Sequence, residues 1–432
     1  MNKTIITTFW LSVGLISLLP AQNFTLNPYS RYAIGDIFQT TTTRNAAMGG
    51  IGMATDNYFS INRSNPASYA DLLYTTMDVS AFGQFNRMES KSAVISPFNA
   101  GFHDAAFAFP SNKGPAFTFG FAPYSAVGYE VSTQKEIQLD TTYIERNRYN
   151  GGGGLNQAFL GVAFRMLKRR LRLGVNMQYV WGNTEYNWSS ELFQSDSVAS
   201  TLHNPIRVQE VVFVNGVIGT AGVMYVDTLN SEKRTLIRLG GTVESTVGMK
   251  GDRATFFDNG TIADSLSTLE RSSITLPLKV GAGVMIHRLG KWSAGADFTF
   301  QDWGTFSYFS DNPELGPEVR FGIGAEITPD FESQNYLKRI SYRFGGYWKQ
   351  TYIQFGGTPV KDFGVSLGFG VPAGAKGNSR FNPGRASSKI SVSAELGRRG
   401  AFNEGLPLEQ YYARLRLGIA INDRWFIRRV VD

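Results

Sequence analysis

Apolar and polar residues alternate along most of this chain, from about residue 74 to residue 421. A period of two places successive side chains on opposite faces of a β-strand. One face of each predicted strand is apolar, while the other carries Arg, Glu, Lys, Asp or Gly. A soluble sandwich buries its apolar face, whereas a membrane barrel turns that face toward lipid. A clear example is the run Ala413, Leu415, Leu417 and Ile419, which alternates with Arg414, Arg416 and Gly418.

Residues 1–21 have the features of a cleaved secretory signal. Lys3 supplies the positive start, residues 5–19 are mostly apolar, and Ala21 offers a small residue at the cut. The alternative, a membrane-spanning helix, needs about 20 apolar residues, and this run is shorter. The chain has no cysteine, which excludes a lipoprotein anchor, disulfides and thiolate metal ligands. Export together with alternating strands predicts the outer membrane of a diderm bacterium.

Residues 22–72 lack the alternation and contain small residues, turn formers and short apolar patches. We expect a compact segment with one or two short helices, which fills the lumen as a hatch; a disordered periplasmic leader is the alternative. The barrel then occupies residues 73–421, and residues 422–432 form a periplasmic tail with a basic, aromatic sequence. This tail either meets phospholipid headgroups or docks to a partner.

The strand count predicts an all-β transmembrane barrel of about fourteen antiparallel strands, an even number as bacterial outer-membrane barrels require. Short connections such as 111–114, 167–170 and 288–291 are assigned to the periplasm, and 372–388 is a long exception. The longer connections near 133–154, 187–207 and 251–272 are expected as extracellular loops. The expected strands lie near 74–87, 101–109, 115–132, 156–166, 171–186, 208–226, 235–250, 274–287, 292–303, 318–328, 339–350, 361–371, 389–399 and 410–421.

Composition supports a membrane protein rather than a nucleic-acid-binding one. Only 18% of the residues are charged, and the net charge is +7. No run of basic residues interleaved with stacking aromatics is present, so the positive charge indicates contact with anionic outer-membrane lipid or polysaccharide.

The sequence offers no enzyme, cofactor or metal site. Gly364-Val365-Ser366-Leu367-Gly368 spells the nucleophile elbow G-x-S-x-G, but that motif requires a strand–turn–helix context, and Ser366 is expected in mid-strand. The three histidines, His103, His203 and His287, show no metal-ligand spacing. We therefore expect a protein that is not an enzyme.

Alternation assigns a belt of charged and polar side chains to the lumen. Both signs occur, and a charge buried beneath a hatch is costly unless it is paired. These side chains are therefore expected mainly to hold the hatch in register rather than to contact a substrate. The belt comprises Arg172, Asn176, Gln178, Arg238, Glu244, Lys279, Asp297, Glu318, Arg320, Glu326, Arg343, Asp362, Lys389, Glu395, Arg414 and Arg416.

Apolar residues in the predicted loops could capture an apolar molecule. They equally fit an aromatic girdle at the membrane rim, as do Trp181, Trp188, Trp303, Trp348 and Trp425. The candidate capture residues are Tyr124, Val127, Phe256, Phe257, Phe306, Tyr308 and Phe309.

Three stretches resemble the FadL-type outer-membrane transport proteins. Asn65-Pro66-Ala67 is similar to the family's hatch motif, Leu276-Pro277 through Asp302-Trp303 resembles its long central hairpin, and 343–347 resembles a later strand. The opening 27–32 and the close 422–427 indicate a divergent branch, related to barrels such as the type IX secretion shuttle.

The resemblance implies passive, energy-independent uptake of small hydrophobic molecules, such as long-chain fatty acids, through a hatch-gated barrel. Asn65, Pro66 and Ala67 would shape the hatch, and Gly120 with Pro123 could bend the third strand and open the wall. The alternative is an accessory barrel that binds protein partners in a secretion or outer-membrane assembly complex.

Overall fold

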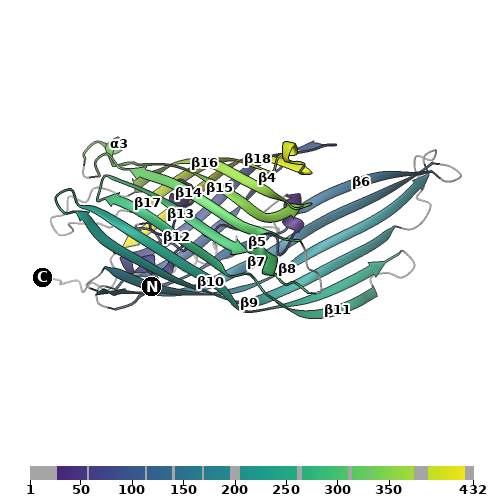
Figure 1. Ribbon diagram of the computed structural model, residues 1–432, viewed down its shortest axis with the longest axis horizontal. Helices are drawn as coiled ribbons and strands as arrows, with labels where there is room; N and C mark the ends of the chain where they lie inside the picture. Colours follow the sequence, from purple (N-terminus) through teal and green to yellow (C-terminus); the bar gives the residue numbers. More distant parts are fainter. Residues whose placement is uncertain are drawn as a thin grey trace, which may run out of the picture.

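The computed structural model describes residues 27–55, 58–111, 114–138, 142–167, 170–194, 205–259, 265–309, 314–331, 333–373 and 388–423. The predicted signal 1–21 and Trp425 lie outside these residues. The chain forms a closed antiparallel β-barrel of 14 strands, which confirms the predicted fold class (Figure 1). The barrel closes where the last strand pairs with the first, from Leu408 opposite Ser90 to Asp423 opposite Thr75.

The barrel strands follow the alternation. Most bounds lie within a few residues of the predicted ones, but β7 begins well before residue 156, and β8 and β10 continue beyond residues 186 and 250. They are β2 (Thr75–Ser90), β4 (Phe98–Phe109), β5 (Ala116–Ala126), β7 (Thr142–Met166), β8 (Leu171–Gln194), β9 (Ile206–Asn230), β10 (Thr235–Asp258), β12 (Lys279–Arg288), β13 (Trp292–Asp302), β14 (Pro317–Ile327), β15 (Ser341–Phe355), β16 (Thr358–Ala373), β17 (Ser388–Arg399) and β18 (Leu408–Asp423).

Short elements complete the fold. The N-terminal segment, residues 27–72, carries three short helices and strand β1, and further short helices lie between the barrel strands. Among the described residues, no helix is long and apolar enough to cross a bilayer. These elements are η1 (Pro28–Arg31), β1 (Asp36–Ile37), α2 (Thr43–Ala46), η2 (Pro66–Asp71), β3 (Val94–Ile95), β6 (Tyr129–Gln138), β11 (Ser265–Ile274), η4 (Trp303–Thr305), α3 (Tyr336–Arg339) and η5 (Phe402–Glu404).

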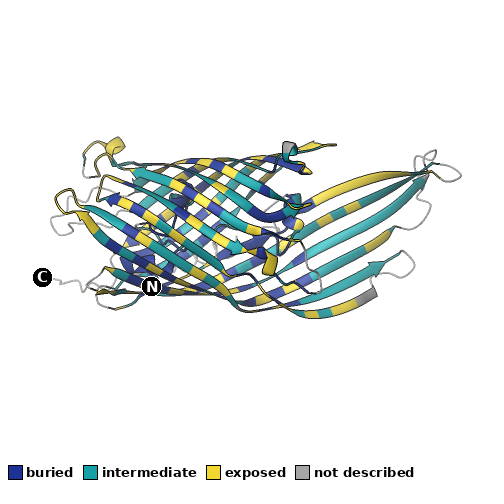
Figure 2. Ribbon diagram, viewed as in Figure 1, coloured by how far each residue is buried: buried dark blue, intermediate teal, exposed yellow. Residues whose placement is uncertain are grey.

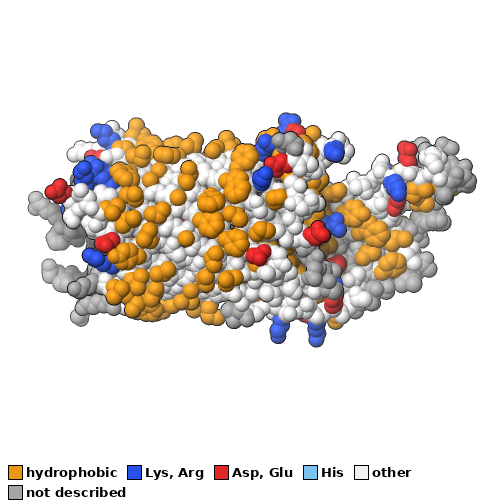
Figure 3. Space-filling model, viewed as in Figure 1, with side chains coloured by type: hydrophobic (Ala, Val, Ile, Leu, Met, Phe, Trp, Pro, Cys, Tyr) orange, Lys and Arg blue, Asp and Glu red, His pale blue; other side chains and the backbone are white. Residues whose placement is uncertain are grey.

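The outward face of the barrel is apolar and the inward face is polar, as the alternation predicts. On β18, Leu415 and Leu417 are half exposed on the outside, while Arg416 between them is 5% exposed. Buried and exposed positions alternate along the strands in Figure 2. In Figure 3, charged side chains gather toward the two ends and leave an uncharged band between them. A bilayer covers such a band, because a charge in its hydrocarbon core is costly.

The wall is much taller on one side than on the other. Strands β7, β8, β9 and β10 have 24 or 25 residues, whereas β12, β13 and β14 have 10 or 11. A spanning strand needs about 9–11 residues. The surplus, with β6 and β11 at its two edges, forms a curved sheet beyond the rest of the barrel (Figure 1), which we call the flange.

The flange corrects the expectation of long extracellular loops near 133–154 and 251–272. Those residues instead belong largely to β6, β7, β10 and β11, and they pair in regular antiparallel ladders. The prediction failed because both faces of this sheet lie above the lipid. Neither face needs an apolar row, so the alternation that marks a membrane strand is missing.

Candidate functional site

The N-terminal segment lies inside the lumen, and its Asn65-Pro66-Ala67 motif is seated on the wall. Asn65 caps η2 by accepting a hydrogen bond from the Ala67 N–H, and its amide donates to the carbonyls of Met53 and Val223 at 2.7 and 3.1 Å. Two glycines that pair across β8 and β9, Gly174 and Gly222, make room for the motif. A β-carbon on Gly222 would lie 2.2 Å from Asn65 Oδ1.

Asp71, at the end of η2, joins the segment to two arginines of the wall. Its carboxylate oxygens lie 2.5 Å from Arg172 Nε and 2.6 Å from Arg238 Nη1, and Arg238 also donates to the Tyr58 hydroxyl. Burial alone would raise the pKa of Asp71, but the two guanidinium groups outweigh it and hold this pKa below its usual range. The pair of ion pairs therefore fixes η2 electrostatically.

Two acidic side chains of the wall hold the middle of the segment. Asp297 Oδ2 accepts hydrogen bonds from the backbone N–H groups of Gly52 and Met53 at 2.5 and 2.8 Å. Glu326 accepts a bidentate pair from Arg44, both distances being 2.9 Å, and a further hydrogen bond from Arg343 at 2.6 Å. These contacts satisfy carboxylates that burial would otherwise destabilise.

Most of the other predicted lumen charges also have partners, on the segment or on a neighbouring strand. Arg320 donates to the carbonyl of Gly49. The ion pairs are Lys279–Glu244 at 3.9 Å, Lys349–Glu318 at 2.9 Å and Arg414–Glu395 at 3.2 Å. Asp362 accepts a hydrogen bond from the Tyr412 hydroxyl at 2.8 Å, and Lys389 lies over the ring of Phe59.

Ser366 lies in mid-strand on β16 and points into the lumen, where its hydroxyl accepts a hydrogen bond from the Gly49 N–H at 2.8 Å. The strand–turn–helix context of a nucleophile elbow is absent around it. Ser366 is thus a further contact between wall and segment.

A chamber of about 240 Å³ lies between the segment and the wall. Its lining combines both charge signs with amides and hydroxyls, including Asp297, Arg320, Tyr347, Glu395 and Arg414. Apolar side chains, among them Phe38, Phe82 and Val280, line the same chamber, so its wall is of mixed character. A second cavity, of about 640 Å³, opens at the periplasmic end, where Tyr58, Phe59, Trp292 and Phe331 line it.

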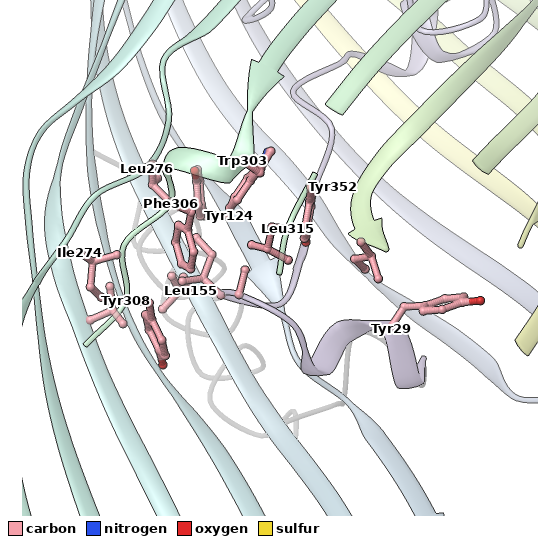
Figure 4. Packing of buried hydrophobic residues seen from close by; sticks show 14 of the residues in the cluster. Tyr29, Tyr124, Leu155, Ile274, Leu276, Trp303, Phe306, Tyr308, Leu315 and Tyr352 are labelled. Atoms are coloured by element: carbon pink, nitrogen blue, oxygen red, sulfur yellow. The ribbon is translucent and has the colours of Figure 1, made fainter. Parts of the chain in front are cut away.

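Aromatic side chains on the extracellular side pack into a buried cluster above the chamber, which we call the apolar cap (Figure 4). Trp303 stacks on Tyr352 with ring centroids 4.3 Å apart, and Tyr308 meets Phe309 edge to face. Labelled members in Figure 4 are Tyr29, Tyr124, Leu155, Ile274, Leu276, Trp303, Phe306, Tyr308, Leu315 and Tyr352.

The cap corrects two expectations. Tyr124, Val127, Phe306, Tyr308 and Phe309 are buried rather than exposed for capture. Trp303, expected in the membrane girdle, is 1% exposed within the cap. The loop after β13 folds inward, where Thr275 pairs with Ser307 and Leu315 with Ile353. Phe256 and Phe257 are not loop residues, because β10 continues to Asp258.

The wall is interrupted beside the predicted kink. The ladder between β4 and β5 ends at Ala105 opposite Phe121, so β4 residues 98–104 have no partner on β5. The β5–β7 register shifts between Pro123 and Ser125, whereas Gly120 lies within the regular ladder. The end of β5 pairs instead with β1, with Ile37 opposite Ser125, and the Phe38 N–H donates to the Tyr124 carbonyl at 2.9 Å.

Several residues that seat the segment escaped the sequence analysis. Gly174, Gly222, Gly240 and Gly324 are inward glycines against which its backbone lies; a β-carbon on Gly240 would meet the Met53 carbonyl oxygen at 1.8 Å. The only available signal was glycine at inward positions of consecutive strands. Asp71 also carried no signal, because its partners are separated from it by 101 and 167 positions.

The fold is that of the FadL-type outer-membrane channels. A Pseudomonas aeruginosa FadL homologue superposes with a TM-score of 0.59 at 11% identity, covering 90% of this chain and 99% of that one. The Pseudomonas putida toluene transporter TodX gives 0.54 at 14% identity, with 89% and 99% covered. The monoaromatic hydrocarbon channel CymD gives 0.53 at 12% identity, with 89% and 98% covered. At these identities the likeness establishes the fold alone.

The particular family is set by the sequence. The sequence profile of the BamG family matches residues 1–432, and the chain belongs to that family. No curated protein matches it.

Proposed function

We propose that this chain is an accessory barrel that binds protein partners in an outer-membrane protein-assembly complex. Its family name associates it with barrel assembly. The observation that carries the proposal is the fixed interior: the N-terminal segment is tied to the wall through Asp71, Asp297 and Glu326, beneath a packed apolar cap. A barrel of this kind acts through its surfaces, and the flange gives it a large extracellular one.

A disulfide between segment and wall tests the proposal. The β-carbon of Thr43 lies 2.9 Å from the position of a β-carbon on Gly418, so Thr43→Cys with Gly418→Cys needs a shift of about 0.6 Å or more to reach disulfide geometry. The chain has no cysteine of its own, so the pair forms a single defined bridge. The oxidised variant should restore normal levels of folded outer-membrane barrels in cells depleted of the native protein.

The single variant Thr43→Cys, which forms no internal bridge, is the matched control. Loss of function only in the bridged protein, with recovery on reduction, would show that the segment has to move and would contradict a fixed accessory barrel. Unaltered barrel levels after depletion of the native protein would contradict a role in assembly.

Uptake of small hydrophobic molecules, including fatty acids, is the second candidate, and the interruption between β4 and β5 favours it. This break lies where the chamber, the segment and the outer wall meet, with Phe38 and Phe82 packed beside it at 5.8 Å. A variant Asn65→Ala should then alter fatty-acid uptake, because the segment loses its cap on η2. Normal uptake by Asn65→Ala and by Pro66→Ala would remove this candidate.

A further inference from the structure

The outward face of the flange carries a compact polar patch that neither the interior nor the family explains. Four neighbouring strands, β7 to β10, each contribute two outward residues to it, and they enclose a hollow of about 360 Å³. Trp188 and Val208 also line the hollow. The eight outward residues are called the outer-face patch: Arg148, Asn150, Asn187, Ser189, Arg207, Gln209, Phe256 and Asp258.

The lower row of the patch presents three amides and an aromatic ring. Asn150 pairs with Asn187, Asn187 with Gln209, and Gln209 with Phe256, so the four side chains stand side by side across the sheet. Each amide offers both donors and an acceptor, which matches the hydroxyl groups of a sugar. The flat apolar face of a pyranose ring packs well on an aromatic side chain.

The upper row carries charge. Arg148 pairs with Ser189, Ser189 with Arg207, and Arg207 with Asp258. Arg207 lies 3.6 Å from Asp258, and Arg148 lies 3.9 Å from Glu191 on the same wall. Both arginines are more than half exposed, and exposed pairs of this kind are weak. Their guanidinium groups can therefore turn to a phosphate or carboxylate on a bound molecule.

The height of the patch above the membrane identifies the source of such a molecule. Tyr179 and Trp181 stack outside β8 with centroids 5.5 Å apart, as an aromatic pair does at the lipid interface. Asn187 is six positions further along the same strand, which is roughly 15 Å above that interface for a tilted strand. The sugars of outer-leaflet glycolipids occupy that layer.

We propose that the outer-face patch binds the anionic saccharide portion of an outer-leaflet glycolipid. The amide row and Phe256 hold the sugar rings, and Arg148 with Arg207 holds a phosphate or carboxylate substituent. The patch lies on the outer face of the barrel, so this binding is independent of the lumen and of the function proposed above.

Binding of a released, phosphorylated lipopolysaccharide core oligosaccharide to the full-length protein tests the proposal by calorimetry. The double variant Asn187→Ala with Gln209→Ala, and separately Phe256→Ala, should each bind about tenfold more weakly, since each removes hydrogen bonds or ring packing. Asn183→Ala, on the same face and strand but nearer the lipid, is the matched control and should bind normally. Heat-modifiable migration in gels shows that every variant is folded.

Further arms separate the alternatives. Removing the phosphates from the oligosaccharide should weaken its binding to the native protein, but not to Arg148→Gln with Arg207→Gln. Absence of core binding, or equal binding by the patch variants, would overturn the proposal. Binding of alginate without binding of the core oligosaccharide would also overturn it, because that result points to a free polysaccharide. The proposal would fail as well if the patch variants lost a copurifying protein and kept their binding of the saccharide.

Discussion

Single polar side chains decide how the N-terminal segment is held. Asp71 is 3% exposed, and its two charged partners are also buried: Arg238 is 1% and Arg172 is 8% exposed. The carboxylate of Asp71 is the shared counter-charge of both arginines. Removing the carboxylate leaves both arginines in a confined lumen without their counter-charge, which costs far more than losing a surface pair.

We predict that Asp71→Asn lowers the free energy of unfolding by about 3 kcal/mol, the low end for breaking a buried pair. Urea unfolding of the protein in lipid measures this value. The control Asp227→Asn removes a more exposed ion pair near the end of β9, with Arg170 at 3.6 Å, and should unfold as the native protein does. Equal stability of both variants would contradict the anchoring role.

Acid should loosen the same anchor. The pKa of Asp71 is lowered in the folded state, so its contribution to stability is present above its ordinary value of 3.8 and is lost as the pH falls through the lowered pKa. Protease cleavage within residues 27–72 should therefore rise in the native protein below about pH 4. The Asp71→Asn variant should lack this part of the pH dependence of cleavage. If its cleavage depended on pH as that of the native protein does, Asp71 would not be the acid-sensitive anchor.

At the scale of elements, glycines on paired strands let a backbone lie directly against the wall. The motif 65–67 rests on Gly174 and Gly222, which face each other across β8 and β9. Strand interiors are ordinarily weakened by glycine, so close approach of another backbone is the physical reason for it here. The same arrangement recurs where Met48 meets Gly324 and Gly345.

We predict that Gly222→Ala displaces Asn65 and lowers the free energy of unfolding by about 1–3 kcal/mol, as overpacking does. The added β-carbon would lie 2.2 Å from Asn65 Oδ1 and 2.9 Å from a carbon of Pro66. Gly241→Ala, where the nearest atom is 3.4 Å away, serves as the control in the same unfolding and proteolysis assays. Similar behaviour of the two variants would mean that the motif tolerates displacement.

For the whole molecule, the asymmetry of the wall separates a spanning part from an extracellular one. The spanning part is fixed by the apolar outer face and by the ladder that closes between β18 and β2. The flange adds ladders above the membrane, with β6 paired to β7 on one side. Among the described residues of the β6–β7 hairpin, none from 131–149 lines the chamber.

We predict that the barrel still folds when residues 131–149 are replaced by an Asn-Gly turn, since Glu130 and Asn150 are paired neighbours that a two-residue turn can join. Heat-modifiable migration and protease resistance of the barrel should match the native protein. The variant should lose the contribution of Arg148 to the outer-face patch. Failure to insert would show that the flange hairpin takes part in assembly of the barrel.

The amino-acid sequence by itself determined the barrel, its number of strands and the inward charges. These follow from period-two alternation, which is a local property that a bilayer turns into an inside and an outside. Tertiary structure alone decided what those charges contact, because Asp71 and Arg238 are 167 positions apart. It also decided that aromatic loop residues form a cap and that polar segments form a flange. Above the bilayer neither face of a strand contacts lipid, so these segments carry no alternation of apolar and polar residues from which a strand could be predicted.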